Sequence, residues 1–383
     1  MTPLTVRVAC EVVRTFRVDQ IAGLFDVPLE AKTGREFNVE LPAAGGDWQI
    51  GAIVGPSGSG KSSVAREAYG RALYTGGKWP AGKSVLDGFP DSLSIKEITA
   101  TLTAVGFSTP PAWVRPYAVL SNGERFRCDL ARALLTGGDL VAFDEFTSVV
   151  DRTVAKVGSA AVAKAIRSGR IAKRFVAVTC HYDVLDWLTP DWVLDMETCQ
   201  LARGSLRRRP PIELEIYKAE RAAWQLFAPH HYLNPAIPNV CSLWLAAWNG
   251  RPVAAVVCGG HFGRSNGPKK IIRVSRLVVL PDYQGVGIGG AVLNAVAGRY
   301  VADGRRVRIT SGHPAMFTFL QRSPAWRLDT IKPHGRPTRT VSAATALAHR
   351  TGNADGVNPF ARTSSAGRAV VSAEYIGPAV AAG

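Results

Sequence analysis

Residues 55–62 read Gly55-Pro56-Ser57-Gly58-Ser59-Gly60-Lys61-Ser62, and this stretch says most about how the first half of the chain folds. The apolar run Ile50-Gly51-Ala52-Ile53-Val54 comes directly before it and predicts a buried strand that leads into a loop. Glycines let the backbone N–H groups of such a loop turn inward around a phosphate. We expect Lys61 to neutralise the β- and γ-phosphates, Ser62 to bind Mg²⁺, and a helix that begins near Lys61 to add its positive end. Together with Ser63, the stretch predicts a binding site for ATP and Mg²⁺.

The length and composition of the chain favour a two-domain soluble protein. At 383 residues it is longer than one hydrophobic core ordinarily supports, and its 46% of hydrophobic residues is normal for a globular protein. It has no uncharged apolar segment of about 18 residues, and its N-terminus lacks the basic-then-apolar layout of a signal peptide. Six scattered cysteines without a CxxC pair suit reduced thiols, not a disulfide framework or a zinc site. We therefore expect a cytoplasmic protein with no membrane partner.

Positive charge is concentrated in the second half of the chain. Residues 1–204 hold 23 lysines and arginines against 22 carboxylates, whereas residues 205–383 hold 23 against 8. This asymmetry suggests that the second half meets a polyanion such as a nucleic acid. A solubilising surface, or attraction to a phosphorylated cofactor alone, explains the same excess. The candidate phosphate contacts are Arg207, Arg208, Arg209, Lys269, Lys270, Arg305, Arg306, Arg336, Arg339, Arg350 and Arg362.

A basic, proline-rich linker at residues 205–212 separates a first domain at 1–204 from a second domain at 213–383. In the first domain, apolar strands alternate with helical stretches, which predicts an α/β domain with a largely parallel sheet. The predicted strands are 6–13, 50–55, 140–144 and 175–180, the helices are 61–73, 124–135 and 153–167, and a small hairpin at 192–195 and 200–202 closes the domain.

The second domain shows a different pattern, which predicts a mixed sheet. Its expected strands are 242–248, 252–258, 271–280, 306–310 and 369–375, and a helix is expected over 289–301. Asn249-Gly250 between the first two strands is a strong signal for a type I′ hairpin. Residues 330–368 are rich in small and basic residues, and we expect a long mobile loop there.

Four further motifs accompany the phosphate loop in the first domain. The strand 140–143 ends in Asp144 and Glu145; the first carboxylate can hold Mg²⁺ and the second can orient the attacking water. Leu120-Ser121-Asn122-Gly123-Glu124 precedes a helix, Ser148-Val149-Val150-Asp151 follows the carboxylates, and His181 closes the strand 174–180. This order resembles the ATP-binding cassette (ABC) family over residues 1–204. The resemblance implies that Ser121 and Gly123 belong to the signature motif that binds ATP, and that His181 is the switch histidine that contacts the γ-phosphate.

The first domain also departs from the family pattern. No glutamine occurs between Gln49 and Gln200, so the glutamine of the family's Q-loop is missing; Asp87 is a candidate replacement. The adenine-stacking aromatic has three candidates, Phe16, Phe25 and Phe37. With no spanning segment, the altered Q-loop favours a non-transport cassette. The family's signature serine acts across a dimer, so the resemblance implies an ATP-dependent homodimer.

The second domain contains a glycine-rich turn between a strand and a helix. The sequence reads Leu277-Val278-Val279-Leu280-Pro281-Asp282-Tyr283-Gln284-Gly285-Val286-Gly287-Ile288-Gly289, and such a turn makes an anion-binding nest. It resembles motif A of the GNAT acetyltransferases over residues 212–330 and 369–378. The resemblance implies that Gln284 through Gly289 hold the pyrophosphate of acetyl-CoA, while Leu277, Val278 and Val279 line the pantetheine arm on a strand that splays from its neighbour. Other acyl-CoA thioesters fit the same turn.

The proton-transfer group of this second site is harder to identify. Many GNAT enzymes use a tyrosine on the later helix, but here that helix reads Ala315-Met316-Phe317-Thr318-Phe319-Leu320. His313 at a strand end is our first candidate for acid–base work. The other candidates are His230, His231 and Tyr232, and Glu374 with Tyr375.

The sequence therefore favours an ATP-hydrolysing cassette coupled to an acetyl-CoA-dependent N-acetyltransferase that modifies a nucleic acid, either tRNA or DNA. One alternative is a protein or small-amine acetyltransferase regulated by ATP. Another is a nucleic-acid-binding ATPase whose second domain is non-catalytic.

Overall fold

The computed structural model describes residues 2–11, 13–25, 32–43, 45–204, 209–231, 236–260, 271–332 and 369–380. It divides into two compact units, which differ from the expected domains in one respect. Unit 1 comprises residues 1–79 and 121–210, and unit 2 comprises residues 80–120 and 211–383. The segment 80–120 is thus an insertion into the first unit that folds with the second. Its ends, Trp79-Pro80 and Leu120-Ser121, are the two places where the chain passes between the units before residue 210.

Unit 1 is built on a six-stranded sheet whose order is β4-β5-β6-β3-β7-β8. The strands are β3 (Ile50–Val54), β4 (Leu73–Tyr74), β5 (Leu140–Phe143), β6 (Arg174–Thr179), β7 (Trp192–Asp195) and β8 (Gln200–Arg203). All neighbours are parallel except β7 and β8, which pair antiparallel as the closing hairpin. The residues of β3 are all buried, because a central parallel strand is covered on both faces. The expectation of a largely parallel α/β sheet is confirmed.

Two helices of unit 1 begin at side chains that cap them. Its α-helices are α1 (Phe16–Phe25), α2 (Lys61–Tyr69), α5 (Asn122–Thr136), α6 (Arg152–Arg167) and α7 (Leu185–Leu188), with short 3₁₀ turns η1 (Gly70–Ala72) and η4 (Tyr182–Val184). Ser121 caps α5 and Asp151 caps α6, each by accepting backbone N–H bonds of the first turn. Phe126 on α5 packs against Phe143 and Phe146, with ring centroids 6.2 and 5.5 Å away. This aromatic cluster fixes α5 beside the end of β5.

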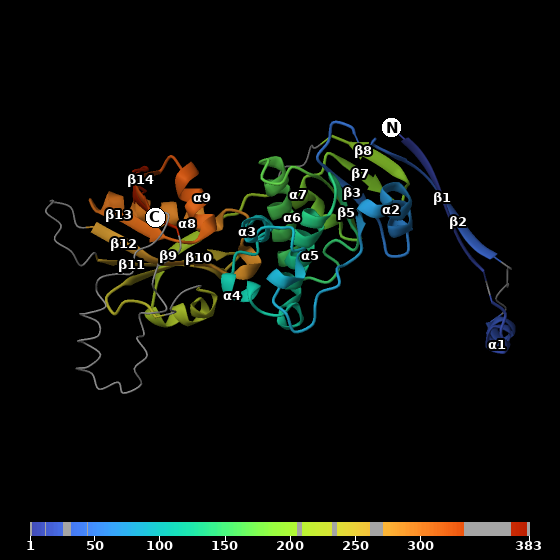
Figure 1. Cartoon of the computed structure of the whole chain (residues 1–383), viewed down its shortest axis with the longest axis horizontal. Helices are drawn as coiled ribbons and strands as arrows, with labels where there is room; N and C mark the ends of the chain where they lie inside the picture. Colours follow the sequence, from blue (N-terminus) through green and yellow to red (C-terminus); the bar gives the residue numbers. More distant parts are fainter. Residues whose placement is uncertain are drawn as a thin grey trace. The chain divides into compact units, whose positions relative to one another are not determined.

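A second, two-stranded sheet precedes the phosphate loop in unit 1. Strands β1 (Thr2–Glu11) and β2 (Lys32–Leu41) pair antiparallel over their whole length, and α1 lies between them in the sequence. Figure 1 shows the two strands as a long ribbon with α1 at its far end. Val6, Phe37, Val39 and Leu41 are buried in one core cluster with Trp48 and β3, so this end of the ribbon belongs to the unit's core.

The insertion in unit 2 carries two helices. They are α3 (Ile95–Ala104) and α4 (Pro110–Trp113), flanked by 3₁₀ turns η2 (Leu86–Gly88) and η3 (Tyr117–Val119). Ser94 and Glu97 form a reciprocal capping box at the start of α3. Between the helices, Phe107 is fully buried, and its carbonyl accepts a bond of 3.0 Å from Trp113 Nε1. The loop 105–109 is therefore held at both ends by its own helices.

The remainder of unit 2 forms a seven-stranded sheet whose order is β14-β15-β13-β12-β11-β10-β9. The strands are β9 (Glu215–Ala219), β10 (Ser242–Trp248), β11 (Arg251–Gly260), β12 (Ile271–Val279), β13 (Arg306–Ser311), β14 (Trp326–Lys332) and β15 (Val370–Tyr375). The helices are α8 (Ile288–Ala302), α9 (Pro314–Arg322) and the 3₁₀ turns η5 (Arg221–Leu226), η6 (Ala228–His230) and η7 (Pro281–Tyr283). Only β12 and β13 pair in parallel, so the mixed sheet is confirmed.

The hairpin between β10 and β11 follows the local sequence signal. Asn249 has φ 51° and Gly250 has φ 73°, the two positive values that a type I′ turn needs. The strand pair Trp248–Arg251 closes directly around this two-residue loop.

Several expectations fall on residues outside those described. They are the linker residues 205–208, residues 333–368 of the loop predicted at 330–368, Tyr232, and the candidate phosphate contacts Arg207, Arg208, Lys269, Lys270, Arg336, Arg339, Arg350 and Arg362. The first three residues of that predicted loop, 330–332, belong instead to β14, because they pair with β15. Among the described residues, no helix combines the length and the apolarity that crossing a membrane needs.

Candidate functional sites

The phosphate loop in unit 1 adopts a conformation that its glycines make possible. Gly58 has φ 78° and Gly60 has φ 88°, values that side chains other than glycine rarely adopt. Gly60 caps α2, and a Cβ atom there would come within 2.5 Å of the Phe37 ring. The loop therefore passes close to β2 while its N–H groups lie at the start of a helix, the arrangement that binds anions.

Two side chains of the loop fit a phosphate group. Lys61 is buried, and its Nζ donates a bond of 2.7 Å to the Pro56 carbonyl, so the ammonium lies over the loop. Ser59 is buried as well, and its Oγ has no hydrogen-bond partner among the described residues. A buried hydroxyl without a partner is destabilising, and a phosphate oxygen would satisfy it.

The start of α2 and the end of β5 meet at one hydrogen bond. Ser62 Oγ donates to Asp144 Oδ1 at 2.9 Å, and the same oxygen accepts the Glu145 N–H at 3.0 Å. A hydroxyl beside a carboxylate suits Mg²⁺, which takes one or two protein ligands and otherwise phosphate and water. The described residues contain no group of three or more His, Cys, Asp or Glu that would hold a metal unaided. The pair therefore fits a metal that arrives with a nucleotide.

Glu145 and His181 follow the ends of neighbouring strands β5 and β6. Glu145 has φ 49°, an uncommon backbone conformation for a side-chain-bearing residue, and its Oε2 accepts a bond of 2.5 Å from Ser148 Oγ. His181 Nδ1 lies 3.3 Å from Thr147 Oγ1. Burial and the nearby Arg152 lower the pKa of His181, while Asp183 and Glu145 act in the opposite direction. The imidazole is therefore neutral near pH 7, and it can donate or accept one hydrogen bond at a phosphate.

The signature segment begins α5. Ser121 Oγ accepts the Glu124 N–H at 3.3 Å and lies 3.0 Å from Glu124 Oε2, while Gly123 is buried. The glutamate that departs from the family signature thus completes a capping box. Asp87, the candidate replacement for the Q-loop glutamine, is bonded to a neighbouring residue: its Oδ2 accepts hydrogen bonds from the N–H and the hydroxyl of Ser84.

The three aromatic candidates for adenine stacking differ in exposure. Phe37 is buried against Gly60, and Arg35 lies over its ring at 5.2 Å. Phe16 and Phe25 on α1 are exposed, at 77% and 66%. Of the three, Phe37 is the one that contacts the phosphate loop.

In unit 2, strand β12 separates from β13 partway along its length. The two strands pair from Ile271–Arg306 to Val274–Ile309, while β12 continues to Val279 and β13 turns to pair with β15. At the same place β12 bulges against β11, since Val257 lies opposite Arg276 and Cys258 opposite Val274. Residues Ser275–Val279 therefore have one edge that faces away from β11, and no strand among the described residues pairs with that edge. The splayed strand inferred from the GNAT resemblance is present.

The glycine-rich turn follows the free end of β12. Gly285 has φ 90° and Gly287 has φ 102°, and Gly287 caps the 15-residue helix α8. No described side chain caps the first turn of α8, so its N–H groups remain available for an anion. Gly289 packs against β12, since a Cβ atom there would lie 3.2 Å from Val279 Cγ2. The turn and the unpaired strand together fit a pyrophosphate and an extended amide-containing arm.

The first residue of this turn, Gln284, is bonded to the insertion. Its Nε2 donates to Val279 O at 2.9 Å and to Thr109 Oγ1 at 3.3 Å, and its Oε1 accepts the Ser108 N–H at 2.7 Å. Nothing in the sequence indicated the contact with Ser108, because Ser108 contributes backbone atoms only.

His313, at the end of β13, contacts the same serine. Its Nδ1 accepts the Ala315 N–H at 3.3 Å as the cap of α9, so the other nitrogen carries the proton; Nε2 then donates to Ser108 O at 3.0 Å. Burial lowers the pKa of His313, and the bond to Ser108 partly offsets this. The imidazole is neutral, and each of its two nitrogens takes part in a hydrogen bond.

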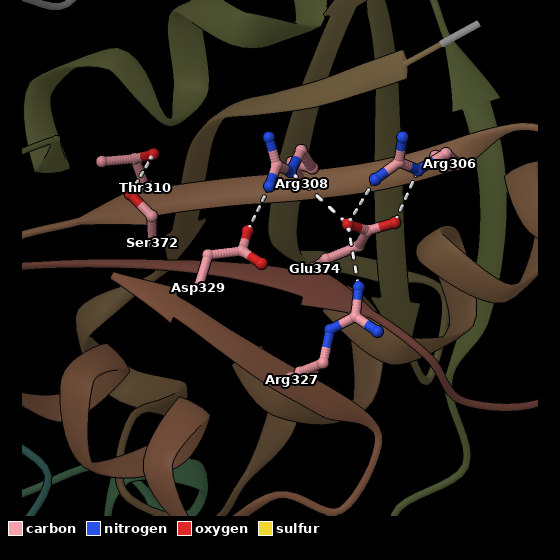
Figure 2. A network of polar contacts seen from close by, with 7 residues as sticks. All are labelled: Arg306, Arg308, Thr310, Arg327, Asp329, Ser372 and Glu374. Atoms are coloured by element: carbon pink, nitrogen blue, oxygen red, sulfur yellow. Dashed lines mark hydrogen bonds and ion pairs between the residues drawn. The ribbon is translucent and has the colours of Figure 1, made fainter. Parts of the chain in front are cut away.

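The other acid–base candidates have structural partners. Glu374 is buried and accepts two bonds of 2.7 Å from Arg306, with Arg308 and Arg327 also within 4 Å (Figure 2). Hydrogen bonds from Arg306, followed by the charges of all three arginines, lower the pKa of Glu374, which makes it a weak base. Tyr375 donates to Pro378 O at 3.2 Å, and His231 packs against Trp224.

Comparisons with known proteins give one family model and several solved structures. Residues 208–317 match the model of the acetyltransferase (GNAT) family. No curated protein matches the chain. Among solved structures it is similar to a bacterial Atm1-family ABC exporter with ATP bound, with a TM-score of 0.34 and 21% identity over 45% of this chain and 35% of the exporter. The chain thus spans about a third of that protein's length.

Two further solved structures are similar to parts of the chain. A dimeric bacterial ABC transporter cassette has a TM-score of 0.34 and 15% identity over 42% of this chain and 84% of its own. The ribosomal-protein-S18-alanine N-acetyltransferase from Escherichia coli has a TM-score of 0.29 and 14% identity over 45% of this chain and 97% of its own. The chain is a mixed α/β protein, and residues 208–317, all but the first three of them in its second unit, match the GNAT acetyltransferase family.

Proposed function

We propose that this protein couples an ATP-hydrolysing cassette to an acyl-CoA-dependent N-acyltransferase. The observation that carries the acyltransferase is the free edge of β12 followed by the glycine turn, inside the segment that matches the GNAT family. The observation that carries the ATPase is the bond between Ser62 and Asp144 beside the phosphate loop. Domain boundaries at 1–204 and 213–383 remain our proposal for the two functional parts.

In the ATPase part, the residues have complementary tasks. Gly55 through Ser63 wrap the phosphates, Lys61 neutralises the β- and γ-phosphates, and Ser62 with Asp144 holds Mg²⁺. Bound there, Mg²⁺ would supply positive charge that offsets the negative charge of the phosphates. Glu145 orients the attacking water, and neutral His181 contacts the γ-phosphate. Ser121 and Gly123 act on ATP held by a second copy of the chain, which makes an ATP-dependent homodimer the working form.

In the acyltransferase part, the turn Gln284–Gly289 binds the pyrophosphate of acetyl-CoA, and Leu277, Val278 and Val279 line its pantetheine arm. An acceptor amine attacks the thioester carbonyl, so that a C–N bond forms and the C–S bond breaks. One proton must leave the amine and one must reach the departing thiolate. His313 is our candidate for this proton transfer, and its Nε2 must leave Ser108 to perform it.

We infer that the acceptor is a nucleic acid from the excess of positive charge in residues 205–383. Two candidate contacts among the described residues, Arg209 and Arg305, are exposed. Arg306, in contrast, is paired with Glu374 and is better explained as a sheet-stabilising residue. If a nucleic acid is the acceptor, its affinity falls steeply with salt.

The experiment that tests this proposal follows labelled acetyl-CoA. The purified protein is incubated with the label, ATP, Mg²⁺ and total cell extract, and the RNA, DNA and protein fractions are then counted. Label in RNA or DNA supports a nucleic-acid acceptor, and label in protein or small amines supports an ATP-regulated acetyltransferase of another class. ATP hydrolysis stimulated by nucleic acid without thioester cleavage would mean that the second unit is non-catalytic.

A further inference from the structure

The insertion 80–120 touches the proposed acyl-CoA site through one short backbone segment. Ser108 N–H donates to Gln284 Oε1 at 2.7 Å, and Ser108 O accepts from His313 Nε2 at 3.0 Å. The neighbouring Thr109 is buried, and its Oγ1 accepts from Gln284 Nε2 at 3.3 Å. A single serine therefore joins a residue that follows β12 to a residue that follows β13.

These two partners lie where the site must admit its ligand. Gln284 begins the turn that we propose binds pyrophosphate. Its Nε2 also donates a hydrogen bond to the carbonyl of Val279 on the free edge of β12. His313 follows the strand from which β12 diverges. Because Ser108 bonds to both, it spans the two chain segments that diverge to admit a pantetheine arm.

The segment that holds Ser108 is firmly supported. Phe107 is fully buried and its N–H donates to Leu102 O at 2.8 Å, while Thr109 O accepts the Ala112 N–H at 2.9 Å. Pro110 and Pro111 follow, and prolines limit the backbone freedom of the helix start. Ser108 therefore lies in a loop that a buried side chain and backbone hydrogen bonds hold in place.

Both ends of the insertion are attached to helix α5 of unit 1. Trp79, the last residue before the insertion, donates from Nε1 to Asp129 Oδ1 at 2.9 Å, and Arg132 lies over its ring at 4.9 Å. Ser121, the first residue after the insertion, caps the same helix. The helix that carries the signature segment Ser121–Glu124 therefore holds the chain at both points where the insertion departs and returns.

We propose that Ser108 and Thr109 are a latch that closes the acyl-CoA site. In the latched state Gln284 and His313 are bonded to the insertion; in the open state Gln284 faces the pyrophosphate and His313 Nε2 is released for proton transfer. The inference rests on the proposed acyl-CoA site. Since only the open state binds the ligand, the apparent dissociation constant is the intrinsic value divided by the open fraction.

The test measures acetyl-CoA binding to the full-length protein by calorimetry without nucleotide. Ser108→Pro removes the N–H that Gln284 Oε1 accepts, and Thr109→Val removes the hydroxyl that accepts from Gln284 Nε2 while keeping the shape of the side chain. Loss of one such bond should tighten acetyl-CoA binding about fivefold. Thr99→Val is the matched control, because the Thr99 hydroxyl bonds only within α3, to Ile95 O and Lys96 O, and the affinity should stay at the wild-type value.

Hydrogen exchange of the unmodified protein provides a second test that does not depend on whether the Ser108→Pro variant folds. Acetyl-CoA should speed exchange in a peptide that spans Ser108, because the ligand displaces the latch and frees that N–H. The latch is refuted if both latch variants keep wild-type affinity, or if acetyl-CoA slows or leaves unchanged the exchange at Ser108. Absence of acetyl-CoA binding in every variant, the wild type included, would instead overturn the proposed acyl-CoA site.

Discussion

Ser62 Oγ donates a hydrogen bond of 2.9 Å to Asp144 Oδ1, joining two residues that are 82 positions apart in the chain. The first stands in the opening turn of α2 and the second directly follows β5. Because β3 and β5 both pair with β6 in parallel, their carboxyl ends meet at one edge of the sheet. The bond therefore brings together the two side chains that we propose as ligands of Mg²⁺.

Removal of either partner should impair ATP hydrolysis. We expect Ser62→Ala and Asp144→Asn each to lower kcat roughly 100-fold, because each removes a group that positions charge at the phosphates. Both variants should also need more Mg²⁺ for half-maximal activity. A phosphate-release assay over a Mg²⁺ titration measures both effects. Ser168→Ala, which removes a hydroxyl at the far end of α6, is the control and should behave as the wild type.

Glu145→Gln should trap an ATP-bound dimer. The substitution keeps the size of the side chain but removes the carboxylate that orients water, so ATP binds without being hydrolysed. Light scattering with ATP and Mg²⁺ should then report twice the monomer mass. Addition of Lys61→Ala to the same variant removes the phosphate contact and should restore the monomer. A Glu145→Gln protein that remains monomeric with bound ATP would contradict the dimer.

Two glycines of the phosphate loop provide a matched test of its geometry. Gly58 and Gly60 both have positive φ, but a Cβ atom at Gly58 meets nothing within 4 Å, whereas one at Gly60 meets the Phe37 ring at 2.5 Å. Gly58→Ala should therefore lower the free energy of unfolding only by backbone strain, about 1 kcal/mol. Gly60→Ala should lower it further, by about 1–3 kcal/mol, because the buried ring must shift. Equal losses in denaturant unfolding would show that the close approach does not exist.

Glu374 should make stability depend on pH. Its pKa is lowered in the folded protein, so its contribution is present above the unfolded value near 4.3 and is lost as the pH falls through the lower folded value. We expect Glu374→Gln to lower the free energy of unfolding by about 1–2 kcal/mol at pH 7, and less in acid. Arg306, Arg308 and Arg327 keep 42%, 41% and 60% exposure, which limits the penalty of leaving them unpaired.

The control for that measurement is Glu36, on the β1–β2 ribbon. Its partner Arg7 is 78% exposed and its own side chain 44%, so this ion pair is fully accessible to solvent and salt. Glu36→Gln should leave the free energy of unfolding close to the wild-type value at any pH, because exposed ion pairs contribute little. If Glu374→Gln changed the free energy of unfolding as little as this control does, the arginine cluster of Figure 2 would not contribute to stability.

The features that sequence predicted best are those set by local residues. The strand, loop and helix around Lys61 and the turn at Asn249-Gly250 each depend on glycine or asparagine at fixed positions, and both are present. Helix α3 was missed, although Ser94 and Glu97 stand three residues apart as a capping box. The same capping-box pattern occurs at Ser121 and Glu124, where the sequence departs from the signature motif.

The contacts that sequence could not predict join side chains to backbone atoms that are distant in the chain. Ser108 bonds Gln284 and His313 across 176 and 205 positions through its own N–H and C=O, which every residue but proline carries. No side-chain pattern encodes such contacts. A domain boundary at residue 204 places Ser108 in a different domain from Gln284 and His313, so nothing in the sequence gives a reason to expect them in contact. Strands β9 and β14 were missed as well, because tertiary pairing with β10 and β15 decides them.

Calorimetry on the purified chain tests the central claim most directly, because it detects two separate phosphate-binding sites on one polypeptide. Titration with ATP and Mg²⁺ should give one binding event per chain, and titration with acetyl-CoA should give another; Lys61→Ala should abolish the first and spare the second. Absence of heat with both ligands, or loss of both events in Lys61→Ala, would contradict the account.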